Sequence, residues 1–395
     1  MMQSMPTVLT AERLFDGATL LDHPVVEIED GRISSISPRA ARALPADARV
    51  LDFPGATLAP AFLDVHIHGA AGHDAMEATP AALDAIGGFL ASRGTASFLA
   101  TTVTAPLDAT LRAVSGLAKL IARPAREAVA QPLGIHLEGP FLSHAKRGVQ
   151  PPEHLLVPDI TTFDRLFEAA EGHVRLMTLA PELPGAAELT AHATRRGVRV
   201  SLGHSDATAA ETRAAIAAGA VSATHTFNAM RALDHREPGI LGVVLTESAL
   251  FAELICDGIH TAPEMVRLWW RAKGPEHAIL VTDAMSAAGM PDGEYQLGGF
   301  TVQVAEGRAI ARGVLAGSLL TLDRALANLV AFAGAPLEQA LRALTVNPAT
   351  MIGAEDEAGS LAAGQPANLV AVSAAGRLLA SIVRGQAGAP HEKKI

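Results

Sequence analysis

The hydrophobic and polar positions divide the chain into a long middle part and two different ends. Through the middle, short and almost entirely apolar runs alternate with longer stretches in which apolar residues recur at helical spacing. The apolar runs predict eight strands, at 57–65, 97–103, 132–138, 174–180, 198–204, 221–225, 251–256 and 278–283. Between most of them the helical spacing predicts helices, at 79–93, 106–122, 161–171, 185–196, 208–218 and 262–272.

This alternation predicts an α/β fold. Strands that are apolar on both faces are typical of parallel sheets covered by helices. Eight strand–helix units over roughly 225 residues favour a closed (β/α)8 barrel of the TIM type over an open doubly wound sheet. No glycine-rich dinucleotide or phosphate-loop motif follows the first predicted strand, which also argues against the open nucleotide-binding form.

The two ends show short strands and turns instead. Residues 25–33 carry the turn dipeptide Asp30-Gly31, which predicts a hairpin, and a turn at Gly364 precedes an apolar run at 368–372. Neither end is long enough for a good core of its own. We therefore expect residues 1–56 and 359–395 to form one small β-sandwich domain beside a catalytic barrel domain at 57–358.

Composition limits the partners of the chain. Its 395 residues, 49% hydrophobic and 18% charged, exclude disorder of the whole chain and suggest two to three domains. The net charge of −10 and the lack of a basic run argue against nucleic acid or an anionic membrane as a partner. The sequence shows neither a signal-peptide pattern nor 18 continuous apolar residues, so we expect a cytoplasmic protein.

Cysteine and histidine usage directs attention to metals. The single cysteine, Cys256, excludes an internal disulfide and a four-cysteine zinc site. It lies in an apolar run, and we interpret it as a buried residue rather than a nucleophile. The chain has 15 histidines against one tyrosine and two tryptophans.

Six metal-capable side chains stand at the C-terminal ends of five predicted strands. They are His66 and His68 on the first strand, Glu138 on the third, His204 on the fifth, His225 on the sixth and Asp283 on the eighth. The C-terminal face of a barrel is where its active site is built, so these side chains are expected to converge. A lone His-x-His pair or a single strand-end residue is a weak indication, but six together indicate a metal site.

The spacing fits the chemistry of such a site. His66 and His68 are two residues apart, so both point to the same face of a strand. Neutral imidazole and carboxylate are ligands that zinc and iron accept. Glu138 is suited to bridge two ions because a carboxylate has two oxygens, and His204 and His225 would complete the second ion.

Asp283 would lie against a water bound to the metal. A divalent ion acidifies such a water to near neutral pH, so that it becomes hydroxide. A neighbouring carboxylate can accept the proton and later pass it to a leaving group. This arrangement is typical of metal-assisted hydrolysis.

Other loops at the same face are candidates for binding a substrate. Residues 226–230 follow His225 directly, Arg236 lies on a turn soon after, and His260 follows the seventh strand. An arginine and a histidine there could hold an anion such as phosphate, although Arg236 could equally be a solvated charge paired with Glu237. Residues 315–318 precede a helix expected near 319 and could either bring backbone amides to a ligand or only cap that helix.

With these residues the chain resembles the amidohydrolase superfamily and, within it, the N-acetylglucosamine-6-phosphate deacetylase family. The resemblance covers essentially the whole chain. It is carried by DVHIHG (64–69), HLEGPF (136–141), GHSDAT (203–208), THTFNAM (224–230), REPG (236–239), DGIH (257–260), VTDAMSAAGMPDGEYQLGG (281–299), LAGS (315–318) and GSLAAGQPANLV (359–370).

The resemblance implies hydrolysis of the acetamide of N-acetylglucosamine 6-phosphate to acetate and glucosamine 6-phosphate. It implies one or two divalent ions, zinc first and iron second, and a homodimer in which the arginine can reach across the interface. The implied roles are principal-ion ligands for Glu138, His204 and His225, second-ion ligands for His66 and His68, acid/base for Asp283, and sugar-phosphate contacts for Asn228, Ala229 through its backbone, Arg236 and His260. Family members that lack both first-strand histidines work with one metal, and this chain retains the pair.

One position departs from the family pattern and keeps alternatives open. Gln150 stands before the Pro-Pro pair where the family usually has a histidine, and it cannot carry a positive charge. Gln150 is therefore a candidate substrate-binding residue that could change the preference among amino sugars, and His144 is a weaker substitute. The alternatives are a deacetylase of the galacto epimer, another N-acyl amidohydrolase, and a barrel that only binds or scaffolds.

Overall fold

The computed structural model describes residues 5–41, 44 and 47–388, and eight parallel strands form the centre of the molecule. Neighbouring strands pair in the order β6, β9, β10, β11, β12, β13, β14, β15. The first and last strands meet where the Asp283 backbone N–H donates to the His66 carbonyl, at 2.9 Å. The strands are β6 (Phe62–Ile67), β9 (Thr95–Thr102), β10 (Gln131–Glu138), β11 (Val174–Leu179), β12 (Arg199–Leu202), β13 (Ser222–Ala223), β14 (Phe251–Ile255) and β15 (Ala278–Val281).

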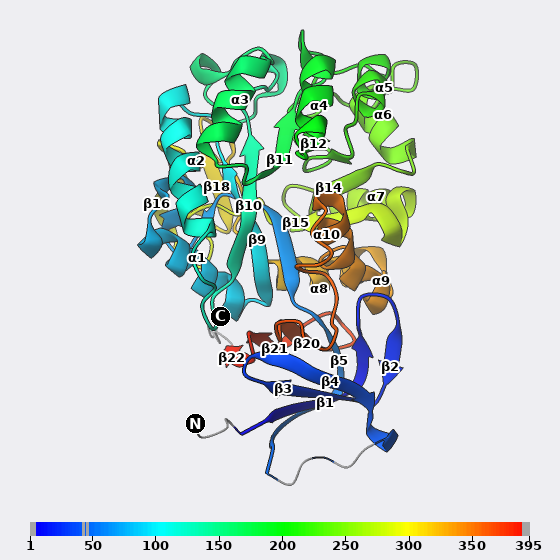
Figure 1. Ribbon diagram of the computed structural model, residues 1–395. Coiled ribbons are helices and arrows are strands. Elements are labelled where there is room, and N and C mark those ends of the chain that lie inside the picture. Colours follow the sequence, from blue (N-terminus) through cyan, green and yellow to red (C-terminus); the bar gives the residue numbers. More distant parts are fainter. Residues whose placement is uncertain (1–4, 42–43, 45–46, 389–395) are drawn as a thin grey trace.

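Helices cover the outside of this barrel (Figure 1). They are α1 (Pro80–Ser92), α2 (Leu107–Ile121), α3 (Ile160–Ala169), α4 (Ala186–Arg195), α5 (Ala209–Ala217), α6 (Gly239–Thr246), α7 (Pro263–His277), α8 (Leu322–Ala333), α9 (Leu337–Arg342) and α10 (Val346–Ile352). The six predicted helices are all present, with α7 running further than predicted. The helix expected near 319 begins at Leu322 instead, because Ser318 is bonded to the end of β15 through its hydroxyl and backbone N–H.

A second sheet joins the two ends of the chain beneath the barrel (Figure 1). Its strands pair in the order β22, β21, β20, β5, β1, β3, β4, with β2 paired to β1. They are β1 (Thr7–Phe15), β2 (Leu20–Asp22), β3 (Pro24–Glu29), β4 (Arg32–Pro38), β5 (Arg49–Pro60), β20 (Leu369–Val372), β21 (Leu378–Val383) and β22 (Gln386–Gly388). The fold class is thus confirmed, a barrel with a small β domain built from both chain ends. The predicted domain boundaries stay a prediction.

The joint between the two chain ends has its own apolar core. β20 runs antiparallel to β5, with Leu369 opposite Pro60. Leu9, Leu58 and Leu369 are fully buried there. The Asp30-Gly31 turn connects β3 and β4 as predicted. Since β6 follows β5 after a single residue, this sheet fixes the place where the first barrel strand begins.

A third, four-stranded sheet lies over one side of the barrel mouth and was not predicted. It consists of β16 (Gly293–Leu297), β17 (Phe300–Ala305), β18 (Arg308–Ala311) and β19 (Val314–Leu315). Its buried face packs with Val103, Val149 and Met285 from the loops that follow barrel strands. The smaller elements are β7 (Gly69–Ala70), β8 (His73–Asp74) and the 3-10 turns η1 (Arg39–Ala41), η2 (Ala75–Glu77), η3 (His144–Lys146) and η4 (Pro152–His154).

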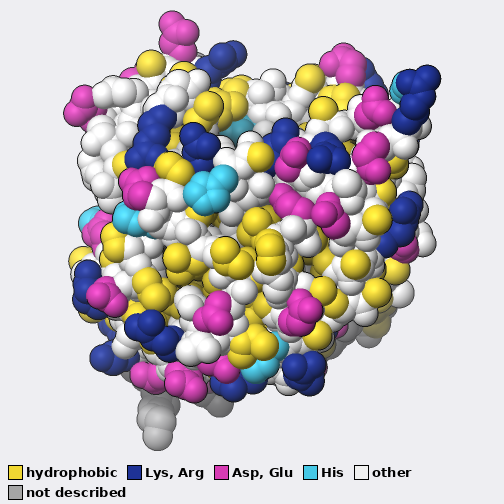
Figure 2. Space-filling model, turned by 90° about the horizontal axis from the view of Figure 1, so that it is seen from above, with side chains coloured by type: hydrophobic (Ala, Val, Ile, Leu, Met, Phe, Trp, Pro, Cys, Tyr) yellow, Lys and Arg dark blue, Asp and Glu magenta, His cyan; other side chains and the backbone are white. Residues whose placement is uncertain are grey.

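The face of the molecule opposite the chain-end sheet carries both signs of charge. Figure 2 shows basic and acidic side chains interspersed around a central band of hydrophobic ones. Across the described residues, none of the helices combines the length and the apolar character that a membrane span requires.

Candidate metal centre and active site

The first ligand group consists of Glu138, His204 and His225. Glu138 ends β10, while His204 and His225 follow β12 and β13 by two residues each. The Glu138 Oε1 atom lies 3.2 Å from His204 Nε2 and 3.1 Å from His225 Nε2, and the two Nε2 atoms are 3.1 Å apart. All three side chains are buried. The structure therefore brings these three residues together, as the sequence predicts.

Backbone geometry and a carbonyl aim the two histidines. The backbone φ is +46° at His204, +29° at His225 and +49° at Asp283, in the left-handed region that non-glycine residues rarely adopt. Such backbone strain concentrates at functional sites. His204 Nδ1 lies 3.0 Å from the Lys146 carbonyl oxygen, which can only accept a hydrogen bond. Nδ1 therefore carries the hydrogen of the neutral ring, and Nε2 presents its lone pair to the other ligand atoms.

The second ligand group consists of His66, His68 and Asp283. His68 Nε2 lies 3.1 Å and His66 Nε2 3.6 Å from Asp283 Oδ1. Glu138 stands between the two groups, because its Oε1 lies 3.3 Å from His66 Nε2 and its Oε2 lies 3.4 Å from His68 Nε2. One carboxylate therefore faces both groups, with Oε1 beside both of them and Oε2 beside His68.

The donor set of both groups fits divalent ions. Within each group the ligand atoms lie within 4.8 Å of one another. Metal–ligand bonds of about 2.0–2.1 Å in a tetrahedron place ligand atoms roughly 3.3 Å apart, close to the spacing of the first group. His66 Nε2 and His225 Nδ1 are buried and have no hydrogen-bond partner among the described residues. The lone pairs of His204 Nε2 and His225 Nε2, which lie 3.1 Å apart, repel each other unless a proton or a cation lies between them.

The electrostatics of the two ligand groups also favour bound cations. Burial disfavours charge on every group, yet the charges of Glu138 and Asp283 raise the pKa of His66 well above its usual value. Burial likewise opposes protonation of His68, but the hydrogen bonds that its ring donates to Asp283 and Glu138 raise its pKa to about 9. The pKa of Glu138 lies well below its usual value, since His66 and His204 outweigh the effect of burial. The site thus gathers negative charge that only cations can balance.

Two buried residues lie behind His66. Glu253, in the middle of β14, has its Oε2 atom 3.2 Å from His66 Nδ1. His136 lies edge-on to the His66 ring and contacts Thr178 Oγ1 at 2.8 Å. Glu253 was missed by the sequence analysis. Its signal was present, because a single carboxylate interrupts the apolar run 251–256.

Gln150 contacts a metal-capable residue. Its Nε2–H donates to Glu138 Oε2 at 2.8 Å, and its Oε1 accepts from the Thr104 backbone N–H at 2.9 Å. The two bonds fix the orientation of the amide, because only the oxygen can accept and only the nitrogen can donate. Gln150 is buried, whereas His144, its weaker substitute in the sequence analysis, is exposed.

The expected substrate residues lie around the same face. Asn228 Nδ2 is 3.4 Å from the His225 carbonyl, and the Ala229 carbonyl accepts from the Ser205 backbone N–H. His260 Nδ1 lies 2.6 Å from Asp257 Oδ2. Burial lowers the pKa of His260, but the hydrogen bond and charge of Asp257 outweigh it and leave that pKa raised.

Arg236 stands apart from these residues. It lies on an exposed loop, and in the described part of the chain its side chain forms no ion pair. The alternative pairing with Glu237 is also absent there, because the Glu237 carboxylate accepts from the backbone N–H groups of Ala209 and Gly239. The Arg236 guanidinium is therefore available for an anion.

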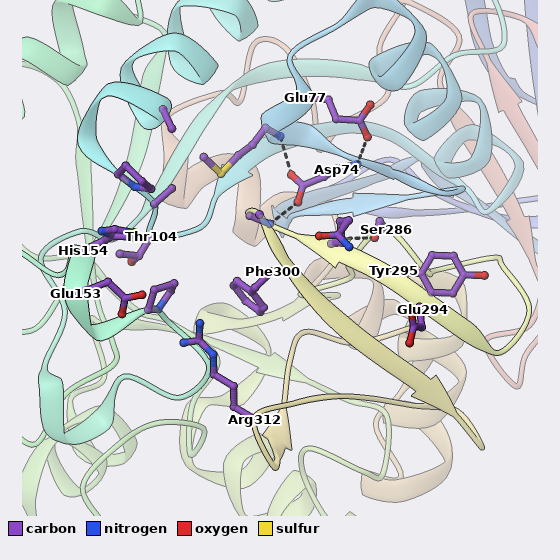
Figure 3. A pocket seen from close by; sticks show the side chains of 18 of the residues that line it. Asp74, Glu77, Thr104, Glu153, His154, Ser286, Glu294, Tyr295, Phe300 and Arg312 are labelled. Atoms are coloured by element: carbon purple, nitrogen blue, oxygen red, sulfur yellow. Dashed lines mark hydrogen bonds between the residues drawn. The ribbon is translucent and has the colours of Figure 1, made fainter.

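A cavity of about 830 Å3 lies between Asp74, Thr104, His154, Phe300 and Arg312 (Figure 3). Its walls are the β16–β18 sheet on one side and the loops after β8, β9 and β10 on the other. Asp74 closes one end by accepting from the backbone N–H groups of Met76 and Gly298. Among the described residues, none of the six metal-capable ones lines this cavity, but Thr104 does and so connects its wall to Gln150.

Cys256 is a buried thiol. Burial raises the pKa of the Cys256 thiol, so it stays protonated and unreactive. This matches its interpretation as a packing residue.

Known proteins of one family match almost the whole of this chain. The model of the amidohydrolase family matches residues 57–388. The chain is 39% identical over 383 residues to the N-acetylgalactosamine-6-phosphate deacetylase of Escherichia coli O157:H7, covering 97% of this chain and 99% of the relative. It is 36% identical over 363 residues to the N-acetylglucosamine-6-phosphate deacetylase of Bacillus subtilis strain 168, covering 91% of each.

Two similar solved structures carry the name of the same kind of deacetylase. The crystal structure of N-acetyl-D-glucosamine-6-phosphate deacetylase from Mycobacterium smegmatis is similar with a TM-score of 0.88 and 38% identity, covering 97% of this chain and 100% of that one. The N-acetylglucosamine-6-phosphate deacetylase of Pasteurella multocida matches with a TM-score of 0.89 and 30% identity, covering 97% of this chain and 99% of that one.

Proposed function

The chain belongs to the amidohydrolase family, and from this premise we propose that it removes the acetyl group of N-acetylglucosamine 6-phosphate, giving glucosamine 6-phosphate and acetate. The observation that carries the proposal is the meeting of two ligand groups at one carboxylate, Glu138. Relatives and solved structures that act on 6-phosphorylated N-acetyl sugars support the substrate class.

The proposed ligands of the principal ion are Glu138, His204 and His225, with His66 and His68 holding a second one. A divalent ion in such a site polarises the acetyl carbonyl and acidifies the attacking water. Asp283 is the proposed general acid/base, because its Oδ1 lies next to both His66 and His68. The carboxylate accepts a proton from the attacking water and delivers it to the departing amine.

The phosphate and sugar are assigned to the loops around the mouth of the barrel. Arg236 and the His260 imidazole, held by Asp257, supply positive charge for the phosphate. Asn228 and the Ala229 backbone would contact the sugar. We propose a homodimer as the working form, since the exposed Arg236 is then free to complete the site of a second copy.

The identity of the ion follows from the donors. Imidazole nitrogen and carboxylate oxygen suit zinc first and iron second. The cytoplasm stays the predicted place of action.

The decisive experiment measures acetate release from N-acetylglucosamine 6-phosphate before and after removal of metal with a chelator. Release should fall to the uncatalysed level on chelation and return when zinc or iron is added back. Release that persists after complete metal removal would refute the proposal. The unphosphorylated sugar is the matched control, and it should be a much poorer substrate because Arg236 and His260 have nothing to bind.

The galacto epimer is a second candidate substrate. The similarity to the N-acetylgalactosamine-6-phosphate deacetylase of Escherichia coli O157:H7 favours it. Comparing kcat/KM for the two phosphorylated epimers decides between them. Gln150→His tests whether this position sets the preference, because the variant restores the residue usual in the family.

A further inference from the structure

A buried carboxylate lies inside the barrel, outside the two ligand groups. Glu253 points inward from the middle of β14 and is completely buried. Its only ion-pair partner among the described residues is His66, since no lysine or arginine there reaches it. Burying a carboxylate without a cation is energetically unfavourable, so its place in this core needs a physical reason.

The reason is the orientation of His66. Glu253 Oε2 lies 3.2 Å from His66 Nδ1, while His66 Nε2 faces Glu138 Oε1 at 3.3 Å and Asp283 Oδ1 at 3.6 Å. In the neutral imidazole, the carboxylate accepts a hydrogen bond from Nδ1–H, which leaves the lone pair on Nε2, on the side of the ligand groups. His66 Nε2 itself has no hydrogen-bond partner in the described part of the chain.

The two ligand groups differ in how their histidines are held. In the first group, His204 Nδ1 lies against the neutral Lys146 carbonyl. In the second group, His66 Nδ1 lies against the charged Glu253. A carboxylate partner makes an imidazole more electron-rich and adds a negative charge near the ion.

We propose that Glu253 is a positioning residue for a second divalent ion. Its carboxylate presents His66 Nε2 as a ligand, and its charge makes the second ligand group bind an ion tightly, so that the resting protein holds two ions. The inference rests on the metal site of the proposed function and adds to it the group that controls occupancy of the second position.

Two substitutions separate charge from hydrogen bonding. Glu253→Gln keeps an oxygen that can accept from His66 Nδ1 but removes the charge. Glu253→Met has a similar length and removes both. Glu253 Oε2 also accepts from the His225 backbone N–H at 3.3 Å, so binding of the first ion must be followed in the same samples.

The experiment titrates the metal-free full chain with Mn2+ and measures bound ions per chain by mass spectrometry and electron paramagnetic resonance. Two neighbouring Mn2+ ions give a coupled spectrum, whereas a single ion gives an isolated six-line spectrum. The wild type should bind two ions. Affinity for the second should fall about 10-fold in Glu253→Gln and about 100-fold in Glu253→Met, with the first ion changed less than about 3-fold.

Lys273→Met is the control for general damage. Lys273 is also a buried charged residue, but its ammonium donates to the Val244 and Glu247 carbonyls, away from the ligand groups. This variant should keep two coupled ions even where its stability is lower. In a His66→Asn background, Glu253→Met should cause no further loss of metal, because both changes act through the same ligand.

Three results would overturn the inference. They are a wild type that binds one ion, a Glu253→Met variant that keeps the second ion within 3-fold of the wild-type affinity, and equal loss of both ions. Acetate release measured in parallel separates this inference from the proposed function. A chain that passes the metal test without releasing acetate refutes only the substrate, and an active chain indifferent to Glu253 refutes only this inference.

Discussion

The two ligand groups use similar side chains but are built in different ways. The first group takes its residues from β10 and from the loops after β12 and β13, and its three ligand atoms lie 3.1–3.2 Å apart. The second group straddles the closure between β6 and β15, is looser, and has a buried carboxylate behind it. Tight ligand spacing preorganises the first group, whereas accumulated negative charge is what favours an ion in the second.

This difference indicates separate tasks for the two groups. A preformed triad holds an ion without rearrangement and suits the principal position. The second group contains Asp283, the proposed acid/base, so an ion there would also bias the proton that Asp283 holds. Substitutions in the first group and in the second should therefore have different effects on metal binding and activity.

The largest effect is expected where the groups meet. Glu138→Gln removes the carboxylate that faces both groups, so both ions should bind poorly and kcat/KM should fall on the order of 10^4-fold. Metal analysis and acetate release on the same sample test this. A variant that keeps both ions and most of its activity would show that the groups are independent of Glu138.

Asp283→Asn should come next and should separate chemistry from binding. Loss of a general acid/base typically costs 10²–10⁴-fold, so we expect kcat to fall about 10³-fold while the first ion stays bound. Steady-state kinetics with parallel metal analysis measures both. Near-normal kcat would remove Asp283 from its assigned role.

A matched pair of histidine variants compares the groups directly. His204→Asn should lower kcat/KM on the order of 100-fold and His68→Asn about 10-fold, because the first group holds the principal ion. Each should lose one ion, and a different one. Equal losses of activity in the two variants would mean that the groups contribute alike.

Removing the proposed phosphate contact should affect binding only. Arg236→Ala should raise KM for the phosphorylated sugar roughly 10- to 100-fold and leave kcat nearly unchanged, as expected for one charge-assisted contact. Arg165→Ala, at an exposed position on α3, is the control and should behave as wild type. An unchanged KM in Arg236→Ala would reject the phosphate assignment.

The smallest effect concerns pH. Because Asp257 keeps the pKa of His260 raised, the imidazolium and its hold on phosphate persist below that pKa and are lost as pH rises through it. Asp257→Asn should lower this pKa, so KM should begin to rise at a lower pH. A few-fold difference from wild type is expected at pH values between the two pKa values, and it should vanish well below both of them. If the KM–pH profiles of wild type and Asp257→Asn coincide, His260 is not a phosphate contact that depends on Asp257.

The barrel and its ligands could be read from the sequence because both leave a local signal. Each strand is a short apolar run, and each metal-capable residue closes such a run, so topology alone brings the residues together. His204 and His225 lie two residues beyond β12 and β13 instead of within the predicted strands. That shift is set by the left-handed backbone at these positions, which periodicity does not reveal.

What the sequence did not reveal depends on contacts between distant residues. α6 is apolar on nearly every side, so it has no helical periodicity to detect. The β16–β19 sheet spans residues 293–315, for which the sequence analysis predicted no strand. Gln150 was expected near the sugar, and its bond to Glu138 depends on how the loop after β10 folds back. The substrate role of Gln150 stays a prediction.

The pairing of β20 with β5 bears on how the protein is made. The strand that leads into β6, and so into His66 and His68, pairs with β1 on one side and with β20 on the other. Before residues 369–372 have been synthesised, β5 has β1 beside it but an open second edge, so we expect the chain-end sheet to close only after the strands of the barrel have been made. Stalled nascent chains that end before residue 369 should be cleaved readily by protease around β5, whereas released chains should resist.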